Sequence, residues 1–243
     1  MKIIKLNAID STNTYLINLG KRGELLDKTI VVAESQNKGK GQLGNMWQSK
    51  PKQSLTFSVF KRFEDLAASN LSSIAFAVSI GMHHALKNML VPQVTIKWPN
   101  DIMSYSKKVT GILIENQLKQ NKIVSSVIGI GLNVNEEDFE NLPQATSILL
   151  ATGKKHNLEE VLQLVSEEIL IQLEKVEQGE YKNLKIEYEE LLFRKNTVST
   201  FESNQGIRFN GKIKGVSEAG ELLIENDQEI ISKHQLKEIK YLF

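Results

Sequence analysis

Apolar and polar side chains alternate along several stretches of the chain, which is the pattern of half-buried strands. The first stretch, residues 2–9, has apolar side chains at every second position from Ile4 to Ala8. These runs predict that strands make up much of the first 135 residues. Further strands are predicted at 29–34, 54–60, 94–98, 108–116 and 122–135.

Helical spacing of apolar residues is clearest over residues 70–90, where apolar side chains recur every four positions. A shorter helix is predicted after Asp10 and Ser11, which offer a cap, and it should end near Gly20 or Gly23. Together with the strands, these helices predict a mixed α+β domain. Two further helices are predicted at 158–177 and 181–193.

The pattern changes at about residue 196. From there, short strand candidates are separated by turns of the Asn-Gln-Gly, Asn-Gly and Ala-Gly types. We therefore expect a mixed α+β domain over residues 1–195 and a small β-barrel over residues 196–243.

Charge and composition exclude several classes of function. The 243 residues include 30 basic and 29 acidic ones, so a net charge of +1 gives no long-range attraction to nucleic acid or anionic membranes. The chain has no cysteine, which excludes disulfides, thiolate metal sites and a cysteine nucleophile, and its four histidines lack metal-ligand spacing. It contains neither an apolar run of roughly 20 residues nor a signal peptide. We expect a soluble, cytoplasmic protein without a nucleic-acid or membrane partner.

A loop over residues 37–47 holds three glycines and two lysines but no acid. Its Gly39-x-Gly41-x-x-Gly44 string does not indicate a dinucleotide site, because a strand and not a helix follows it. The kinase HRD and DFG motifs and the Lys-Ser/Thr of a P-loop are also missing. Glycine amides and the charge of Lys40 would nevertheless suit an anion. The alternative is a solvated hairpin loop.

Two later segments carry polar groups at or near strand ends. In KWPNDIM, Pro99 ends a strand and Asn100-Asp101 follow, either as a turn or as functional groups. In KKVTGILIEN, strict alternation places Lys108 on one face with Thr110, Ile112 and Ile114, and Val109, Gly111, Leu113 and Glu115 on the other. Lys108 would then either extend to solvent at the strand end or point into a pocket toward an anionic group.

The strand VIGIGLNVN has one apolar face and one nearly bare face. Gly129 and Gly131 precede Asn133 on the bare face, while isoleucine, leucine and valine occupy the other. Glycine weakens a strand, so two of them at this spacing favour close approach of a ligand or of a packed helix.

Taken together, five motifs resemble those of biotin protein ligases in order and spacing. The resemblance covers about 135 residues and implies a class II synthetase-like fold, with a mixed, mostly antiparallel sheet flanked by helices and a C-terminal SH3-like barrel. Because no DNA-binding helix-turn-helix precedes residue 1, we expect the short form. The motifs are DSTNTYL (10–16), AESQNKGKGQLGNMW (33–47), KWPND (97–101), KKVTGILIE (107–115) and IGIGLNVN (128–135).

The resemblance implies a ligase that activates biotin with ATP to biotinyl-5′-AMP and then transfers biotin to one lysine of a biotin carboxyl carrier protein or domain. Mg²⁺ would accompany the ATP phosphates without a dense set of protein ligands. The protein would be a monomer or a homodimer. Lipoate–protein ligases share this chemistry but would favour a long apolar tunnel over a polar pocket, and a catalytically silent binding module is the third alternative.

The same resemblance implies roles for individual residues. Ser11, Thr12, Asn13 and Gln36 would bind the polar biotin head, Lys108 would offset charge repulsion between two anions, and Asp101 would orient the carrier lysine or accept its proton. The implied catalytic residues are Lys108, Asp101 and Lys40. The implied biotin-binding residues are Ser11, Thr12, Asn13, Gln36, Gly39, Lys40, Gly41, Gln42, Lys108, Gly111, Gly129 and Gly131. The implied ATP-binding residues are Lys40, Gln42, Trp47, Asn100, Asp101, Lys108 and Asn133.

This chain departs from the family pattern in two places. The family loop usually reads Gly-Arg-Gly-Arg-Arg-Gly, whereas this chain has Lys40, Gln42 and Leu43 in place of the three arginines. A lysine lacks the bidentate fork of arginine, so we expect a weaker hold on the phosphate or one supplied elsewhere. Ser54 stands where the family often has an asparagine, so we do not expect the contact that the asparagine would make.

Overall fold

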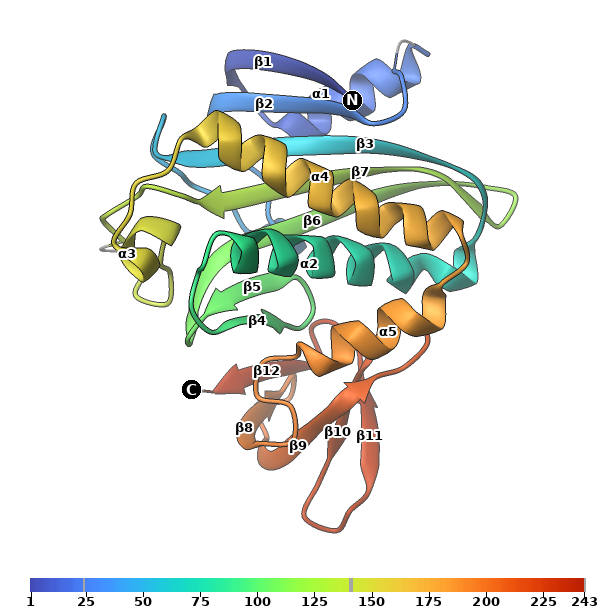
Figure 1. Ribbon diagram of the computed structural model, residues 1–243. Helices are drawn as coiled ribbons and strands as arrows, with labels where there is room; N and C mark the ends of the chain where they lie inside the picture. The colour runs from blue at the N-terminus through green and yellow to red at the C-terminus, as the bar shows by residue number, and fades with distance from the viewer. Residues whose placement is uncertain (24, 140–141, 243) are drawn as a thin grey trace.

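The computed structural model describes residues 1–23, 25–139 and 142–242. Its centre is a seven-stranded sheet in the order β1-β2-β3-β7-β6-β5-β4 (Figure 1). β1 and β2 are parallel and the other neighbours are antiparallel, which confirms the predicted mixed, mostly antiparallel sheet. The strands are β1 (Lys2–Ile9), β2 (Thr29–Gln36), β3 (Ser54–Ala67), β4 (Val94–Lys97), β5 (Asp101–Ser104), β6 (Lys107–Lys119) and β7 (Lys122–Asn133).

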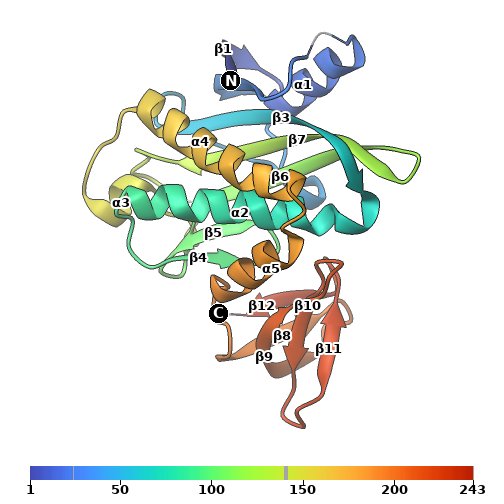
Figure 2. The same ribbon diagram turned by 45° about the vertical axis from the view of Figure 1, so that its right-hand side comes forward.

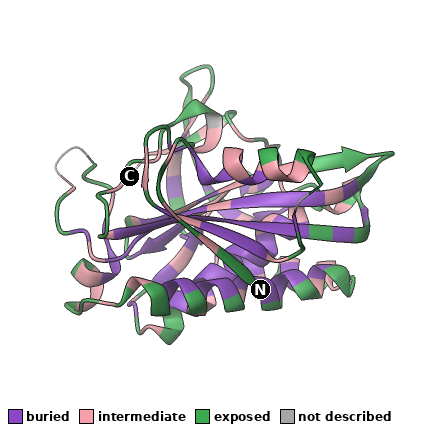
Figure 3. Ribbon diagram, turned by 90° about the horizontal axis from the view of Figure 1, so that it is seen from above, coloured by how far each residue is buried: buried purple, intermediate pink, exposed green. Residues whose placement is uncertain are grey.

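Helices cover both faces of this sheet. On one face, α2 (Leu71–Asn88) and α4 (Leu158–Glu177) pack on the main apolar core (Figure 1). Viewed from above, the helices along the lower edge have their buried residues on the side that faces the sheet (Figure 3). Within the described ranges, no helix is both long enough and apolar enough to cross a membrane.

The opposite face of the sheet carries α1 (Thr12–Lys21), which connects the parallel strands β1 and β2. Leu16 of this helix packs against Val31, Phe60 and Val127, whose neighbours along the strands belong to the main core. The predicted cap is present, since the Ser11 side chain accepts a hydrogen bond from the Thr14 amide. This face is where α1 approaches the bare strand β7.

The C-terminal part forms a second, five-stranded antiparallel sheet in the order β11-β10-β9-β8-β12 (Figure 2). Within the described residues β11 and β12 are the two edges of this sheet, so the predicted barrel is not closed. α5 (Tyr181–Glu190) leads into it, and the predicted boundary at 195/196 lies in the connection after α5. The strands are β8 (Val198–Ser203), β9 (Arg208–Val216), β10 (Leu222–Glu225), β11 (Ile231–His234) and β12 (Ile239–Leu242).

Two short elements were not expected from the sequence. β5 forms a hairpin with β4, so Asp101 begins a strand instead of standing in a turn after one. α3 (Ile148–Thr152) is a single helical turn capped by Ser147, and five residues are too few to show helical spacing. The remaining short pieces are the 3₁₀ turns at Gln42–Gly44 and Ala68–Asn70.

Candidate active site

The floor of the site is a flat part of the sheet made by β6 and β7. Gly111 pairs with Gly131 and Leu113 pairs with Gly129, so the three glycines lie on one surface. A Cβ atom at Gly129 would overlap Asn13, and one at Gly131 would overlap the Trp47 ring. The glycines therefore allow side chains from α1 and from the 37–47 loop to lie directly on the backbone of the sheet.

A bulge in β6 determines where Lys108 points. Met103 pairs with Lys108 but Ile102 pairs with Thr110, so Val109 is an extra residue in β6. The strict alternation that grouped Lys108 with Ile112 is therefore wrong. Val109 is fully buried in the main core, whereas a Cβ at Gly111 would lie 3.1 Å from Lys108 Nζ. Lys108 shares the face of Gly111 and points into the site.

The Lys108 ammonium has an acidic partner next to the cavity. Its Nζ lies 2.7 Å from Asp101 Oδ1, an ion pair whose atoms are not aligned as a hydrogen bond. Lys97 pairs with Asp101 across the β4–β5 hairpin, and its ammonium lies 5.3 Å from the centre of the Tyr241 ring in β12. Burial lowers the pKa of Lys97; Asp101 opposes this effect and Lys108 adds to it.

The glycine loop folds back on itself beside the floor. Lys40 forms a bridge with Met46, the Trp47 amide donates to the Gly39 carbonyl at 3.0 Å, and Gly44 turns the chain with a φ of +83°. Gly39 is buried because Trp47 runs close beside it. The Trp47 ring lies on Gly111 and Gly131, 5.6 Å from Lys108 Nζ, and its own Nε1 is buried without a partner in the described chain.

Hydrogen bonds connect the polar side chains at the other end of the site. The Thr12 amide donates to Gln36 Oε1 at 2.8 Å, and Thr12 Oγ1 lies 2.7 Å from Ser58 Oγ. Asn13 Nδ2 donates to Glu115 Oε2 at 2.7 Å. These groups are neutral except for Glu115, in contrast to the ammonium at the other end.

The two ends and the floor enclose a cavity of about 50 Å³. It brings together most of the residues that the sequence motifs predicted. Gly39 and Asp101 do not line the cavity, and Asn133 is buried with its amide donating to the Thr146 carbonyl at 3.0 Å. The lining residues are Ser11, Thr12, Asn13, Gln36, Lys40, Gly41, Gln42, Trp47, Phe57, Asn100, Lys108, Gly111, Ile112, Leu113, Gly129, Ile130 and Gly131.

The positions that depart from the family pattern differ in how they are placed. Gln42 lines the cavity and Lys40 is exposed at its rim, so the loop offers one mobile ammonium and one amide. The side chain of Leu43 lies outside the described part of the chain. Ser54 is buried and donates to Glu136 Oε2 at 3.1 Å, which places it away from the cavity.

Sequence reasoning missed Ser58 and Glu115. Ser58 is fully buried between Thr12 and Asn13, and Glu115 was noted only for its face of the strand. A signal for Ser58 exists in the run SLTFSVF, where Ser54, Thr56 and Ser58 occupy alternate positions. Because Thr56 pairs with Gly131 and Ser58 with Gly129, this polar face continues the glycine floor onto β3.

The arrangement suits a molecule with a neutral polar group at one end and an acidic group at the other. Uncharged donors and acceptors bind the first, and an ammonium on a low-polarity floor stabilises negative charge near the second. In residues 1–23, 25–139 and 142–242, no cluster of three or more histidine, aspartate or glutamate side chains could hold a metal ion.

Comparisons with known proteins agree with this geometry. The model of the biotin/lipoate A/B protein ligase family matches residues 6–133. The structure of the biotin protein ligase from Aquifex aeolicus in complex with biotin and ATP superimposes with a TM-score of 0.80. It is 30% identical in sequence, and the match covers 99% of this chain and 98% of that one.

Two curated relatives are longer than this chain. The bifunctional ligase/repressor BirA of Bacillus subtilis (strain 168) is 30% identical over 211 residues, 83% of this chain and 63% of the relative. The biotin–[acetyl-CoA-carboxylase] ligase of Mycobacterium tuberculosis is 30% identical over 142 residues, 57% of this chain and 52% of the relative. The chain thus spans less than two thirds of the length of either. The family match and the superposition over nearly the whole of both chains show that this chain belongs to the biotin/lipoate A/B protein ligase family.

Proposed function

We propose that this chain activates biotin with ATP to biotinyl-5′-AMP and transfers the biotinyl group to a lysine of a biotin carboxyl carrier protein. The observation that carries the proposal is the polarity of the site. A neutral hydrogen-bonding end formed by Thr12, Asn13 and Gln36 is separated by a glycine floor from the Lys108 ammonium. Biotin has a matching shape, with a cyclic urea at one end and a carboxylate at the other.

In the first step, a carboxylate oxygen of biotin attacks the α-phosphorus of ATP and pyrophosphate leaves. Both reactants are anionic, so a cation between them lowers their repulsion and stabilises the negative charge of the transition state. Lys108 supplies that cation, with Lys40 and Gln42 closing from the loop. Mg²⁺ would be carried on the ATP phosphates, because the described chain offers no carboxylate cluster to hold it.

In the second step, the amine of the carrier lysine attacks the acyl carbon and AMP leaves. The attacking amine must lose a proton, and Asp101, beside Lys108, is the carboxylate placed to orient it or accept that proton. The nucleotide would lie against Trp47, Asn100 and the glycine floor. Asn133 would support the adenine region from behind, through the backbone at Thr146.

The polar end favours biotin over lipoate. A long apolar tunnel would suit the lipoyl chain and its dithiolane ring, whereas Ser11, Thr12, Asn13 and Gln36 gather hydrogen-bonding groups in one place. The cytoplasmic location, the monomeric or homodimeric state, the absence of a nucleic-acid partner and the domain boundary at 195/196 stay predictions from the sequence.

Pyrophosphate exchange into ATP tests the proposal. Exchange should depend on biotin and not on lipoate, and transfer to a purified carrier domain should appear on a streptavidin blot. Exchange with lipoate alone would assign the chain to lipoate–protein ligases. Absence of exchange with both acids would leave a binding module without catalytic activity.

A further inference from the structure

A chain of hydrogen bonds runs behind the polar end of the site, from Glu115 to Gln36. Asn13 Nδ2 donates to Glu115 Oε2 at 2.7 Å and more weakly to the Leu113 carbonyl at 3.4 Å. Ser58 Oγ donates to Asn13 Oδ1 at 2.5 Å and lies 2.7 Å from Thr12 Oγ1. Thr12 in turn donates to Gln36 Oε1 from its amide at 2.8 Å and from its hydroxyl at 3.1 Å.

The donor and acceptor roles in this row of hydrogen bonds are fixed at its two ends, Glu115 and the Thr12 amide. An ionised carboxylate can only accept, so Glu115 requires Asn13 to turn its NH₂ group toward β6 and its oxygen toward Ser58. Ser58 has one proton, and because the amide oxygen can only accept, that proton goes to Asn13. At the other end the Thr12 amide can only donate, so Gln36 must turn its oxygen toward Thr12.

What remains for a ligand is one acceptor and one donor group. Both hydrogens of the Asn13 amide are used, so Asn13 offers a lone pair of Oδ1, which lies over Gly129. The single Thr12 hydroxyl proton goes either to Ser58 or to Gln36, but the Thr12 amide donates to Gln36 Oε1 in both cases, so Gln36 offers the hydrogens of Nε2. A cyclic urea presents a carbonyl acceptor flanked by N–H donors, which is the complement of this pair.

We propose that Glu115 and Ser58 are positioning residues that fix the direction of the Asn13 amide and thereby make the site selective for a ring N–H donor. The inference rests on the proposed function, because it concerns how the same site recognises the urea of biotin. Ser58 is fully buried and Asn13 is 3% exposed, so bulk water does not offer either of them an alternative partner. An inverted Asn13 amide would place two donors against the ligand's own N–H.

The test compares biotin with its two cyclic-carbamate analogues, in each of which a ring oxygen replaces one urea N–H. Exchange kinetics are measured for the unaltered protein, Glu115→Gln, Glu115→Asp and Ser58→Ala. Glu64→Gln is the matched control, because it removes an exposed carboxylate from β3, another strand of the same sheet. Thermal unfolding is followed for every variant.

The unaltered protein should prefer biotin over at least one analogue by about 5- to 30-fold in KM. In Glu115→Gln the side-chain amide can donate as well as accept, so Asn13 can invert. The KM for biotin should rise by about 5- to 30-fold and the preference should fall below about 3-fold, with the KM for ATP unchanged. Glu115→Asp keeps a carboxylate acceptor for the Asn13 amide and should keep the preference for biotin over the analogue.

Ser58→Ala leaves Glu115 in place, so it should raise the KM for biotin without loss of the preference. Unchanged KM and preference in a folded Glu115→Gln protein would overturn the inference, as would an unchanged KM for biotin in Ser58→Ala. Glu64→Gln should behave like the unaltered protein. Failure of the unaltered protein to exchange with biotin would instead overturn the proposed function, so the two failures are distinguishable.

Discussion

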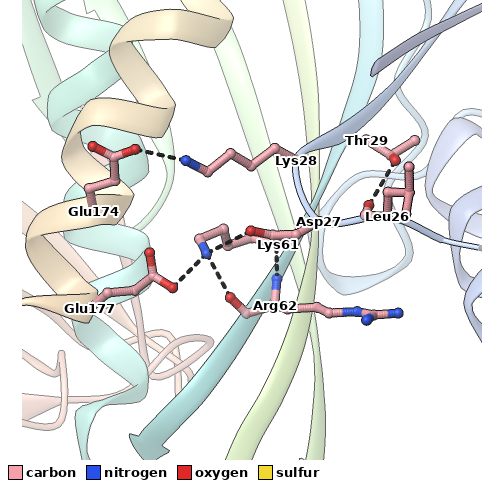
Figure 4. Close-up of polar contacts among 8 residues, drawn as sticks. All are labelled: Leu26, Asp27, Lys28, Thr29, Lys61, Arg62, Glu174 and Glu177. Atoms are coloured by element: carbon pink, nitrogen blue, oxygen red, sulfur yellow. Dashed lines mark hydrogen bonds and ion pairs between the residues drawn. The ribbon is translucent and has the colours of Figure 1, made fainter. Parts of the chain in front are cut away.

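Two lysines of the central sheet, Lys61 and Lys108, carry the same charge in very different surroundings. The Lys61 side chain in β3 is 2% exposed, and its ammonium lies 2.7 Å from Glu177 Oε1 and 3.2 Å from Asp27 Oδ2. It also donates to the Arg62 carbonyl at 2.7 Å, so three oxygens surround it (Figure 4). All three of its protons are thereby used within the protein.

The Lys108 side chain is 34% exposed and has one carboxylate partner among the described residues, Asp101. Its other neighbour is the face of the Trp47 ring, so protons of its ammonium remain available to a ligand. Burial and ion pairing therefore do not distinguish a functional lysine from a structural one in this protein. Lys61 joins β3 to α4 and to the segment before β2, whereas Lys108 is held in direction by one acid and keeps donors for a substrate.

The largest effect is expected from Lys108→Ala. Removing the cation that stabilises the adenylation transition state should lower biotin-dependent pyrophosphate exchange by about 10³-fold. The free energy of unfolding should change by no more than about 1 kcal/mol, because the side chain is partly exposed. Lys107→Ala, an exposed neighbour, is the control, and unaltered exchange in Lys108→Ala would remove the role given to Lys108.

Lys61→Met should lower the stability and leave the exchange activity nearly unchanged, the reverse of Lys108→Ala. It leaves Asp27 and Glu177 without their shared cation and should lower the free energy of unfolding in urea by about 3–5 kcal/mol. Exchange per folded molecule should stay within about 2-fold, because no part of the cavity is altered. The triple variant with Asp27→Asn and Glu177→Gln should recover most of the stability, and no recovery would contradict the ion-pair explanation.

The sequence could not distinguish these two lysines. Each lies beside an apolar run of a strand, Lys61 after its run and Lys108 before it, and the partner Glu177 of Lys61 is 116 residues away in the sequence. The bulge at Val109 results from how β5 and β6 pair, which no residue pattern within β6 reveals. Strands and long helices were predictable because their periodic residues face one large core.

The site was predictable only where its residues form patterns that are local in the sequence. The glycines at alternate positions of β7 are visible as a local pattern, whereas most of the other lining residues were predicted only through the resemblance of five motifs to biotin protein ligases. The connection from Glu115 through Asn13 to Ser58 was not predicted, because it joins α1 to two strands that are distant in the chain. α3 and β5 are too short to show a period.

Acid tests the stability of the fold through a third group, His83. Burial, assisted by the neighbouring His84, lowers the pKa of His83 to about 4. The unfolded chain therefore binds more protons between pH 6.5 and 4, and the free energy of unfolding should fall across this range by up to about 3 kcal/mol. Urea titrations should show this slope in Lys61→Met and lose most of it in His83→Gln. A persistent slope in His83→Gln would assign the acid sensitivity to another group.

The smallest effect is expected from an exposed ion pair. Lys38 lies 3.0 Å from Asp10 Oδ2, but the two side chains are 75% and 55% exposed. Water and salt screen such a pair, so Lys38→Ala should change the free energy of unfolding by less than about 1 kcal/mol. A loss as large as that of Lys61→Met would show that proximity of charges alone, without burial, determines stability in this protein.

The extra residue in β6 has a consequence for variation among related chains. Successive residues of a strand alternate between its two sides, so one inserted residue reverses the side on which all preceding positions lie. The bulge absorbs the inserted residue, because Val109 and Thr110 together oppose Ile102 and Lys108 stays on the side of Gly111. Deletion of Val109 would remove the bulge and leave a regular strand in which Lys108 still faces Gly111. A related chain that keeps this residue but pairs it in a regular ladder would instead turn its lysine toward the hydrocarbon core, with every motif letter unchanged and no charge above the glycine floor.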